Sequence, residues 1–464
     1  SGNVASAIGG AYEVANSCRF NSASSSYLHR TPSVGGDRDK WTFATWIKRS
    51  KTDTNESILG AFSDGSNHTQ FFWRGDNLEF TQKDGGVVTA LLQTTRLFRD
   101  PGAWYHLVCV WDSGNAEAGD RMRIYVNGIE ETAFNSDTNP SLNLDSFLNS
   151  TSYANEIGAA VSTEYFSGAM AHTHFCDGQA YAASDFGEFD STSGIWVAKT
   201  SPSVTYGTNG FFLKYASGAS GTDSSGNGNN MTVSGTITQT KDTPDDNFAT
   251  GNSIDNYWPA STFSNGNNTI VTHSSNYSYN TATIGLTTGL WYWEEEIDSS
   301  SSYDIVGIAP YPSRATSGWL GYYTNSYGYR SDTGQIYTGS SGSAYGDTYT
   351  TGDIMGIYLD LTNNKLYFAK NGTIQNSGTG ISITAAASTE CGCYFPGIGE
   401  YGSSSAGTYN VNFGNGYFGT DLIASASADA GGEGQFKYNP STGTFDGSSK
   451  DFRAICTNNI ATYG

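Results

Sequence analysis

Apolar and polar positions alternate along short stretches of this chain, and turn residues separate the stretches. In residues 41–47, Trp41, Phe43 and Ile47 fall on one face of a predicted strand, whereas Trp46 falls on the other. The same period of two recurs in residues 70–73, 77–80, 104–111, 123–126, 289–297, 305–308, 352–360 and 365–370. A period of two is that of a β-strand, so the pattern predicts many short antiparallel strands.

Asn-Gly pairs mark two of the predicted turns. Asn127-Gly128 and Asn371-Gly372 each follow an apolar strand. Both residue types tolerate the positive φ of a type I′ turn, which makes this pair the strongest short signal for a β-hairpin. The fold class predicted is therefore all-β, with tandem antiparallel β-sandwiches.

The predicted strands gather in two regions. With 464 residues the chain is too long for one ordinary hydrophobic core. Between them, polar runs indicate loops, although residues 210–215 and 231–233 could be strands that return to the first sandwich. The boundaries predicted are a first sandwich over 1–192, a loop-rich connector over 193–250, a second sandwich over 251–415 and a C-terminal tail over 416–464.

Composition supports strands and narrows the range of partners. The chain has 57 Gly, 30 Tyr and 24 Phe, and its net charge is -21. That charge repels nucleic acid and anionic membranes, so neither is an expected partner. We also expect no membrane insertion and no signal peptide, because no apolar run approaches the length of a span and the start, Ser1-Gly2-Asn3, is typical of a cytosolically made protein that has lost its Met.

Six cysteines are too few and too widely spread to predict a disulfide framework. Cys391 and Cys393 form a Cys-Gly-Cys whose side chains would point the same way on a strand. That spacing fits neither a zinc knuckle nor a thioredoxin motif. We therefore expect buried free thiols.

The second region resembles a SPRY domain, an antiparallel sandwich that presents a partner-binding surface through its loops. The resemblance lies in residues 291–297, 306–308, 327–329, 352–356, 364–372 and 394–396, which occur in the expected order. The first region resembles a concanavalin A-like sandwich of the laminin-G type, through residues 41–48, 104–106, 123–128 and 177–179.

The whole arrangement is similar to structural proteins of marine tailed bacteriophages, usually described as tail-fibre or lectin-like virion components. The further residues that carry this similarity are 19–22, 27–32, 185–189, 436–440 and 452–458. It implies a non-enzymatic virion protein, a globular tail-fibre tip or knob that recognises carbohydrate or protein on the host surface. The alternatives are a capsid-decorating protein that binds virion neighbours and, third, a glycan-degrading enzyme.

The same similarity implies partners and a location. The expected partners are other copies of the chain in a cyclic homo-oligomer such as a trimer, other virion proteins, and a glycan or protein of the host surface. The expected location is the virion surface, after synthesis in the host cytoplasm.

Two side-chain patterns raise the question of chemistry. Glu294, Glu296 and Asp298 share one strand face with the spacing of a glucanase site, but Ser300 stands where that pattern needs another Glu. We therefore expect no catalysis there.

A second pattern consists of residue types that commonly bind zinc, namely His172, His174 and Cys176. Side chains two residues apart on a strand, however, can hold one metal ion only with distortion. The favoured interpretation is that these three side chains belong to a polar face that spans neighbouring strands.

Two sets of residues are the candidates for binding. The laminin-G resemblance implies that loop oxygens could hold calcium, and by type the ligands would be Asp112, Asn115, Asp120 and Asp177. No cofactor is required.

The tyrosine-rich stretch 322–329 suits a ligand-binding face, because aromatic rings stack on sugars and give large contact area. Its candidates are Tyr322, Tyr323, Tyr327 and Tyr329, of which about half are expected to be exposed.

Overall fold

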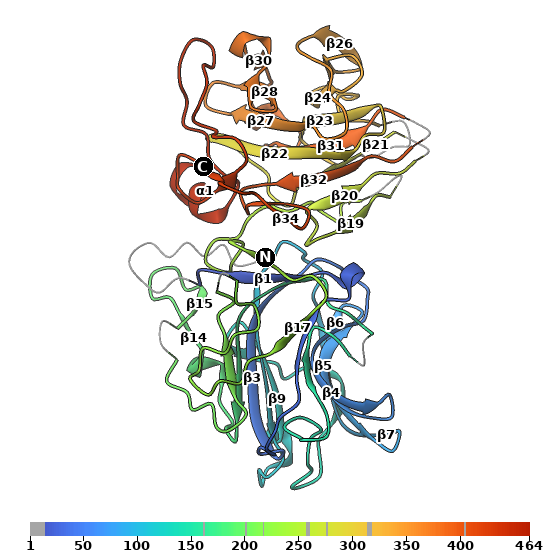
Figure 1. The fold of residues 1–464 in the computed structure, drawn as a ribbon, viewed down its shortest axis with the longest axis vertical. Helices are drawn as coiled ribbons and strands as arrows, with labels where there is room; N and C mark the ends of the chain where they lie inside the picture. Colours follow the sequence, from blue (N-terminus) through green and yellow to red (C-terminus); the bar gives the residue numbers. More distant parts are fainter. Residues whose placement is uncertain are drawn as a thin grey trace. The chain divides into compact units, whose positions relative to one another are not determined.

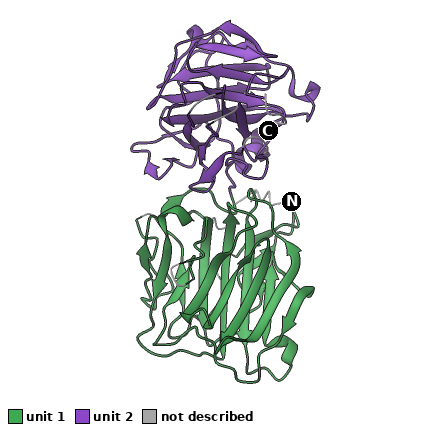
Figure 2. Ribbon diagram, turned by 90° about the vertical axis from the view of Figure 1, so that its right-hand side faces the viewer, with its two compact units in different colours: residues 1–245 green, residues 246–464 purple. Residues whose placement is uncertain are grey.

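The computed structural model describes residues 14–160, 163–199, 202–216, 218–256, 260–274, 277–312, 318–402 and 405–464. The first three residues, which bear on the expected absence of a signal peptide, lie outside these ranges. The chain forms two compact units, Ser1–Asp245 and Asp246–Gly464, shown in Figure 2. Both are built almost entirely from antiparallel strands, which confirms the predicted all-β fold class.

Two eight-stranded sheets form the first unit (Figure 1). One, here the β3 sheet, contains β10 (Ile129–Glu130), β9 (Met122–Val126), β8 (Tyr105–Asp112), β3 (Lys40–Arg49), β13 (Gly168–Asp177), β1 (Ser17–Phe20) and β18 (Thr238–Thr240) in that order, with β16 (Phe211–Leu213) paired to β13. The other, the β5 sheet, contains β11 (Phe134–Thr138), β7 (Val87–Leu97), β6 (Asn77–Asp84), β5 (Asn67–Arg74), β4 (Glu56–Asp64), β12 (Asn155–Ile157), β2 (Tyr27–Arg30) and β17 (Thr232–Ser234).

Strand β8 shows why some of these segments lack a polar face. Leu107, Cys109 and Trp111 point into the core between the two sheets. The alternate residues Val108 and Val110 are buried on the outer face of the β3 sheet. A strand covered on both faces reads as a continuous apolar run rather than an alternating one.

The outer face of the β3 sheet is covered by residues 178–206, here the covering segment. Apart from residues 200–201, which lie outside the described ranges, it contains η3 (Ala183–Asp185) and the ribbon of β14 (Gly187–Phe189) and β15 (Trp196–Ala198). Phe186 and Trp196 are buried there in one apolar cluster with Trp46 of β3 and Trp104, the residue before β8. The sandwich therefore has a second apolar layer on one face.

Residues beyond 206 also return to the first sandwich. Strand β16 pairs with β13, β17 pairs with β2, and β18 pairs with β1. Asp242 reinforces this return, because it accepts hydrogen bonds from buried Lys48 Nζ at 2.8 Å and Trp104 Nε1 at 3.1 Å. The compact unit consequently extends to Asp245, well past position 192.

The second unit is a sandwich of an eight-stranded and a six-stranded sheet (Figure 1). The first, here the β22 sheet, contains β19 (Thr262–Ser264), β20 (Thr269–Val271), β32 (Thr408–Asn412), β22 (Leu290–Ser299), β27 (Ile354–Asp360), β28 (Lys365–Lys370) and β29 (Thr373–Ile374), with β30 (Ile381–Ser382) paired to β28. The β23 sheet contains β21 (Ser278–Thr281), β31 (Phe395–Glu400), β23 (Asp304–Ala309), β24 (Tyr327–Arg330), β25 (Gln335–Thr338) and β26 (Ser341–Ala344).

Both predicted Asn-Gly turns are confirmed. Asn127 and Gly128 have φ of 49° and 82°, and Asn371 and Gly372 have φ of 49° and 78°. Each pair sits in the left-handed region that a type I′ hairpin requires, between β9 and β10 and between β28 and β29.

The C-terminal tail, residues 416–464, packs on the outer face of the β22 sheet. It contributes buried Phe436, Phe445 and Phe452, which contact Tyr292 and Tyr358 of the sheet. Its own elements are β33 (Tyr417–Phe418), β34 (Asp421–Leu422), β35 (Ser427–Ala428), β36 (Gln435–Phe436) and α1 (Thr457–Tyr463). This second unit therefore also carries an apolar layer outside its sandwich.

Helices are few and short in the described ranges. Besides α1 and η3 they are η1 (Ser22–Ser24), η2 (Ala118–Asp120), η4 (Asn376–Gly378) and η5 (Ala386–Ser388). Within those ranges no helix has the length and apolar character needed to cross a membrane.

Candidate functional site

A groove lies on the outer face of the β5 sheet. Strand β5 places Phe71 and Trp73 in the core of the first unit. Because side chains alternate along a strand, His68, Gln70 and Phe72 face outward. The outward positions of β5 and β6, together with Ala160, Thr163 and Glu164, border a cavity of about 220 Å³.

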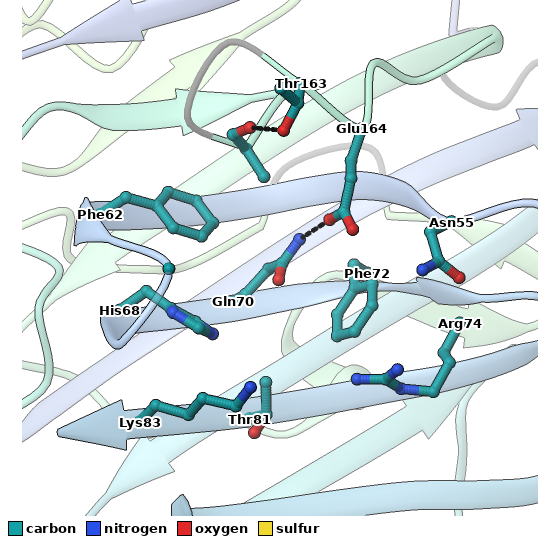
Figure 3. A pocket seen from close by; sticks show the side chains of 12 residues that line it. Asn55, Phe62, His68, Gln70, Phe72, Arg74, Thr81, Lys83, Thr163 and Glu164 are labelled. Atoms are coloured by element: carbon teal, nitrogen blue, oxygen red, sulfur yellow. Dashed lines mark hydrogen bonds between the residues drawn. The ribbon is translucent and has the colours of Figure 1, made fainter. Parts of the chain in front are cut away.

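Aromatic and polar side chains line this groove together (Figure 3). Figure 3 shows His68 and Lys83 on one side of the Phe72 ring and Asn55 and Arg74 on the other. The complete lining is Asn55, Phe62, Gly65, His68, Gln70, Phe72, Arg74, Thr81, Lys83, Ala160, Thr163 and Glu164. The groove therefore combines flat apolar rings with groups that can donate or accept hydrogen bonds.

Hydrogen bonds within the lining hold several side chains in place. Gln70 Nε2 donates to Glu164 Oε2 at 2.8 Å. Arg74 donates from Nε and Nη2 to the two carboxylate oxygens of Glu79, at 2.5 Å and 3.1 Å, and its guanidinium lies 5.2 Å from the centre of the Phe72 ring. A forked pair of this kind fixes the direction of the guanidinium as well as its position.

The backbone of Glu164 is held in an uncommon conformation. Its φ is 46°, in the left-handed region that side chains other than glycine seldom adopt. Ser57 N donates to the Glu164 carbonyl at 2.8 Å and anchors this turn beside β4. Such strain persists only where surrounding contacts impose it, and it occurs often at binding sites.

Two further polar side chains of the lining differ in exposure. His68 is buried, whereas the partly exposed Lys83 side chain takes part in no hydrogen bond or ion pair among the described residues. Burial lowers the pKa of His68, and the neighbouring Lys83 charge acts in the same direction. A neutral imidazole can accept or donate one hydrogen bond, so the groove presents both kinds of partner.

The four tyrosines expected to form a ligand-binding face separate into two pairs. Tyr322 is exposed and Tyr323 is partly exposed, with their rings 4.9 Å apart. Tyr327 and Tyr329 are buried in the core of the second unit, so two of the four tyrosines remain as candidates for a ligand-binding face. They lie on β24, where the strand period directs both inward.

The residues expected to bind calcium are not brought to one point. Asp112 lies beside Lys40, with 3.4 Å between Oδ1 and Nζ, whereas Asp120 is exposed on η2. Asp177 is separated from Asp112 by strand β3, and its carboxylate already accepts hydrogen bonds from three amide groups. Asn115 Nδ2 donates toward Asp112 Oδ2 at 3.5 Å. In the described part of the chain, no three His, Cys, Asp or Glu side chains are placed to hold a metal.

The acidic run of β22 has structural partners. Glu294 is fully buried and accepts hydrogen bonds from the backbone N–H groups of Lys437 and Tyr438 in the C-terminal tail, at 2.9 Å and 2.8 Å. Burial raises its pKa to about 7. Glu296 accepts a hydrogen bond from Asn410 Nδ2 at 2.9 Å, and the Ser300 hydroxyl donates to Asp304.

The histidine pair of β13 lies beneath the covering segment. His174 stacks on Phe212 with ring centres 4.0 Å apart, and its Nδ1 is 2.9 Å from the Tyr206 hydroxyl. The register of β13 shifts between Ala171 and His174, and His172 has a φ of 44°. The favoured reading of a polar strand face is therefore wrong, because an aromatic layer buries these side chains.

The groove itself was missed by sequence reasoning. A usable signal was present, because Phe72 lies on the strand face opposite the core residues Phe71 and Trp73 and shares that outward face with His68 and Gln70. An outward aromatic ring among polar neighbours is a mark of a binding surface. The contribution of Glu164 could not be foreseen, since it reaches the groove from ninety-four residues further along the chain.

Comparison with known families assigns a domain to each region. Residues 21–183 match the concanavalin A-like lectin/glucanases superfamily, and residues 290–415 match the SPRY domain. The groove lies within the first match, and the exposed tyrosine pair lies within the second.

Curated relatives share only part of the chain. The Ran-binding proteins 9/10 homolog of Drosophila melanogaster is 36% identical over 103 residues, which are 22% of this chain and 11% of the relative. Human Ran-binding protein 9 is 36% identical over 86 residues, covering 18% and 12%. The dual specificity protein kinase splA of Dictyostelium discoideum is 29% identical over 136 residues, covering 27% and 5%. The chain thus matches between 5% and 12% of these relatives' lengths.

Solved structures match parts of the chain at low identity and low TM-score. The SPRY domain of human HERC1 has a TM-score of 0.30 at 18% identity, covering 35% of this chain and 96% of that domain. A heptameric pentraxin of Limulus polyphemus has a TM-score of 0.28 at 16% identity, covering 41% and 95%. The family matches show that this chain contains a concanavalin A-like domain followed by a SPRY domain.

Proposed function

We propose that this chain is a non-catalytic binding protein whose first unit holds a saccharide in the groove over β5 and β6. The observation that carries the proposal is the lining itself, in which the partly exposed Phe62 ring and the partly exposed Lys83 and Glu164 side chains border a cavity of about 220 Å³. Sugar rings offer flat C–H faces and many hydroxyl groups, so they are recognised by aromatic rings together with a few placed polar groups.

The number of carboxyl groups in the lining supports binding rather than hydrolysis. Glycoside hydrolysis generally uses two carboxyl groups that flank the scissile bond. Among the described lining residues, Glu164 is the one carboxyl side chain. The nearby Glu79 carboxylate is occupied by Arg74 and by Gln93 Nε2, so it is held as an ion-pair partner.

A protein-binding role is proposed for the second unit. The SPRY match over residues 290–415 and the relatives named Ran-binding proteins support contact with a protein partner. The exposed pair of Tyr322 and Tyr323 is the proposed contact surface, because tyrosine supplies large amphipathic area at low entropic cost.

The biological setting proposed is the surface of a tailed-phage virion. It rests on the similarity of residues such as 27–32 and 436–440 to virion components, and on a net charge of -21, which favours solubility. In that setting the chain would be a globular appendage that contacts host carbohydrate or protein. Cyclic oligomers of the chain would multiply weak contacts into useful avidity.

A glycan array tests the binding proposal. Fluorescently labelled full-length chain is expected to bind a defined subset of saccharides and to release no soluble sugar from them. If the chain bound none of the neutral and charged saccharides, the proposed function would be wrong. If it released soluble sugar, it would be an enzyme rather than a binding protein.

A further inference from the structure

Two thiols of this chain differ from the other four in their accessibility. Cys391 is exposed and Cys393 is partly exposed, whereas the remaining cysteines are buried in apolar layers. The buried ones are Cys18, Cys109, Cys176 and Cys456. Burial raises the pKa of each of these four, which keeps them protonated and unreactive.

The two accessible cysteines occupy a turn rather than the strand that was expected. Residues 391–393 follow η5 and precede β31, and Gly392 has a φ of 69°. The amide of Gly392 donates to the carbonyl of Thr389 at 3.3 Å, which closes the turn. One residue in a turn separates the two cysteines, so their Cα atoms lie within the about 7 Å that two fully extended residues would span.

Their surroundings give the two thiols different exposure. The sulfur of Cys393 lies against Gly285, only 2.8 Å from where a Cβ at that glycine would stand, and the Phe395 ring borders the same space. Cys391 has no such cover and faces solvent. Burial raises the pKa of Cys393, and the charge of Cys391 adds to the shift.

We propose that Cys391 and Cys393 form a covalent modification site for low-molecular-weight disulfides, with Cys391 as the attacking thiol and Cys393 as the resolving thiol. This site is independent of the saccharide groove. It assigns a chemical role to the only two cysteines of the six that solvent reaches.

The reaction proceeds by two thiol–disulfide exchanges. The Cys391 thiolate attacks one sulfur of a disulfide such as oxidised glutathione, forms a mixed disulfide and releases one glutathione thiolate. The Cys393 thiolate then attacks Cys391 Sγ, forms the Cys391–Cys393 disulfide and releases the second glutathione. Two protein thiols are oxidised, one small disulfide is reduced to two thiols, and the two protons go to the released glutathiones or to solvent.

The neighbouring residues show which surface this reaction would affect. Tyr394, directly after the pair, is buried, and its hydroxyl donates to the carbonyl of Thr384 at 2.9 Å. The hydroxyl of Thr384 in turn donates to Asn325 Oδ1 at 2.6 Å, two residues beyond Tyr323. Closing the disulfide would therefore stiffen the turn that supports the loop of the exposed tyrosine pair.

Mass spectrometry of the intact full-length chain tests the site. After incubation of the folded protein with excess oxidised glutathione, the wild type is expected to lose two hydrogens and retain no glutathione. Cys393→Ser is expected to stop with one glutathione attached to Cys391. Cys391→Ser is expected to stay unmodified and serves as the matched control, because its remaining thiols are half-buried or buried.

Peptide mapping of the oxidised wild type keeps the test independent of the variants. A Cys391–Cys393 linkage within one peptide supports the proposal. A wild type that stays reduced, one that accumulates the glutathione adduct, or a Cys391→Ser variant that reacts at the wild-type rate would each overturn it.

Discussion

Lowering the pH from 7 to 5 is expected to destabilise the first unit while it stabilises the second. Burial lowers the pKa of His106 and His172 to about 3, and that of His174 in the same direction. A histidine in the unfolded chain has a pKa near 6.5. Between pH 7 and 5 the unfolded chain therefore binds protons at these histidines, whereas the folded unit does not. The stability that depends on these neutral histidines is present above pH 6.5 and is lost as the pH falls.

The size of the effect follows from these pKa values. His106 and His172 each cost about 2 kcal/mol of unfolding free energy between pH 7 and 5, and His174 adds to the loss. Glu56 opposes this loss, because burial raises its pKa to about 8 despite the attraction of Arg49. Its contribution is similar in size to that of one of these histidines. A net loss of about 2–4 kcal/mol remains.

The groups that face the histidines do not relieve this cost. Trp196 Nε1 of the covering segment donates to His106 Nδ1 at 3.2 Å, and the Tyr206 hydroxyl meets His174. After burial, Lys214 lowers the pKa of His172, and the charges of His172, His106 and Lys214 lower that of His174. Proton uptake would therefore separate the covering segment from the β3 sheet.

In the second unit the sign is reversed. Glu294 has its pKa raised to about 7, and that of Glu295 is raised well above its ordinary value, in both cases mainly by burial. A carboxyl with a raised pKa contributes stability that is complete below pH 4.5 and is lost as the pH rises through the folded value. Glu294 alone gives about 2 kcal/mol between pH 7 and 5.

Hydrogen exchange with peptide resolution measures both units in one experiment. After correction for intrinsic exchange rates, peptides of β3 and β13 should lose protection at pH 5 while peptides of β22 and β27 keep or gain it. His106→Gln should remove about 2 kcal/mol of the pH dependence of the first unit. Equal responses of the two units would contradict these assignments.

Phe452→Ala is expected to destabilise the second unit by about 3–5 kcal/mol, the usual cost of removing a buried aromatic ring. Phe452 is fully buried and lies 5.0 Å from Tyr358 and 4.9 Å from Phe445, between ring centres. The substitution leaves a cavity where the C-terminal tail meets the β22 sheet. Chemical denaturation of the full chain, followed by tryptophan fluorescence, measures the loss.

Leu422→Ala supplies the matched control for the tail. Leu422 belongs to the same tail but is 64% exposed, so its removal should change stability by no more than about 0.5 kcal/mol. If Phe452→Ala were as mild as this control, the tail would not be a structural part of the second unit.

Much of the fold was predictable because period-two patterns and turn chemistry act over short distances. Trp41, Phe43 and Ile47 point into one core as predicted, and Asn127-Gly128 forms the predicted turn. The layers outside the sandwiches were not predictable. Phe186 and Phe452 read in sequence as isolated aromatic residues of loops, and only long-range packing gives them a sheet to cover.

The sites were harder to predict for the same reason. Residue type alone suggested Asp112 and Asp177 as ligands of one ion, but strand β3 separates them. Tyr327 and Tyr329 have the composition of a binding surface, yet the strand period directs them inward. The groove joins Gln70 to Glu164 across ninety-four residues, and no local pattern records that contact.

Calorimetric titration of the full chain with the saccharide that the array selects tests whether the groove over β5 and β6 holds that saccharide. The wild type is expected to bind it, and Lys83→Gln combined with Glu164→Gln is expected to weaken binding at least about tenfold, which corresponds to about 1.4 kcal/mol. Lys214→Gln, an exposed lysine of the same unit outside the groove, should bind as the wild type does. Unchanged affinity in the double variant would show that the saccharide does not occupy the groove.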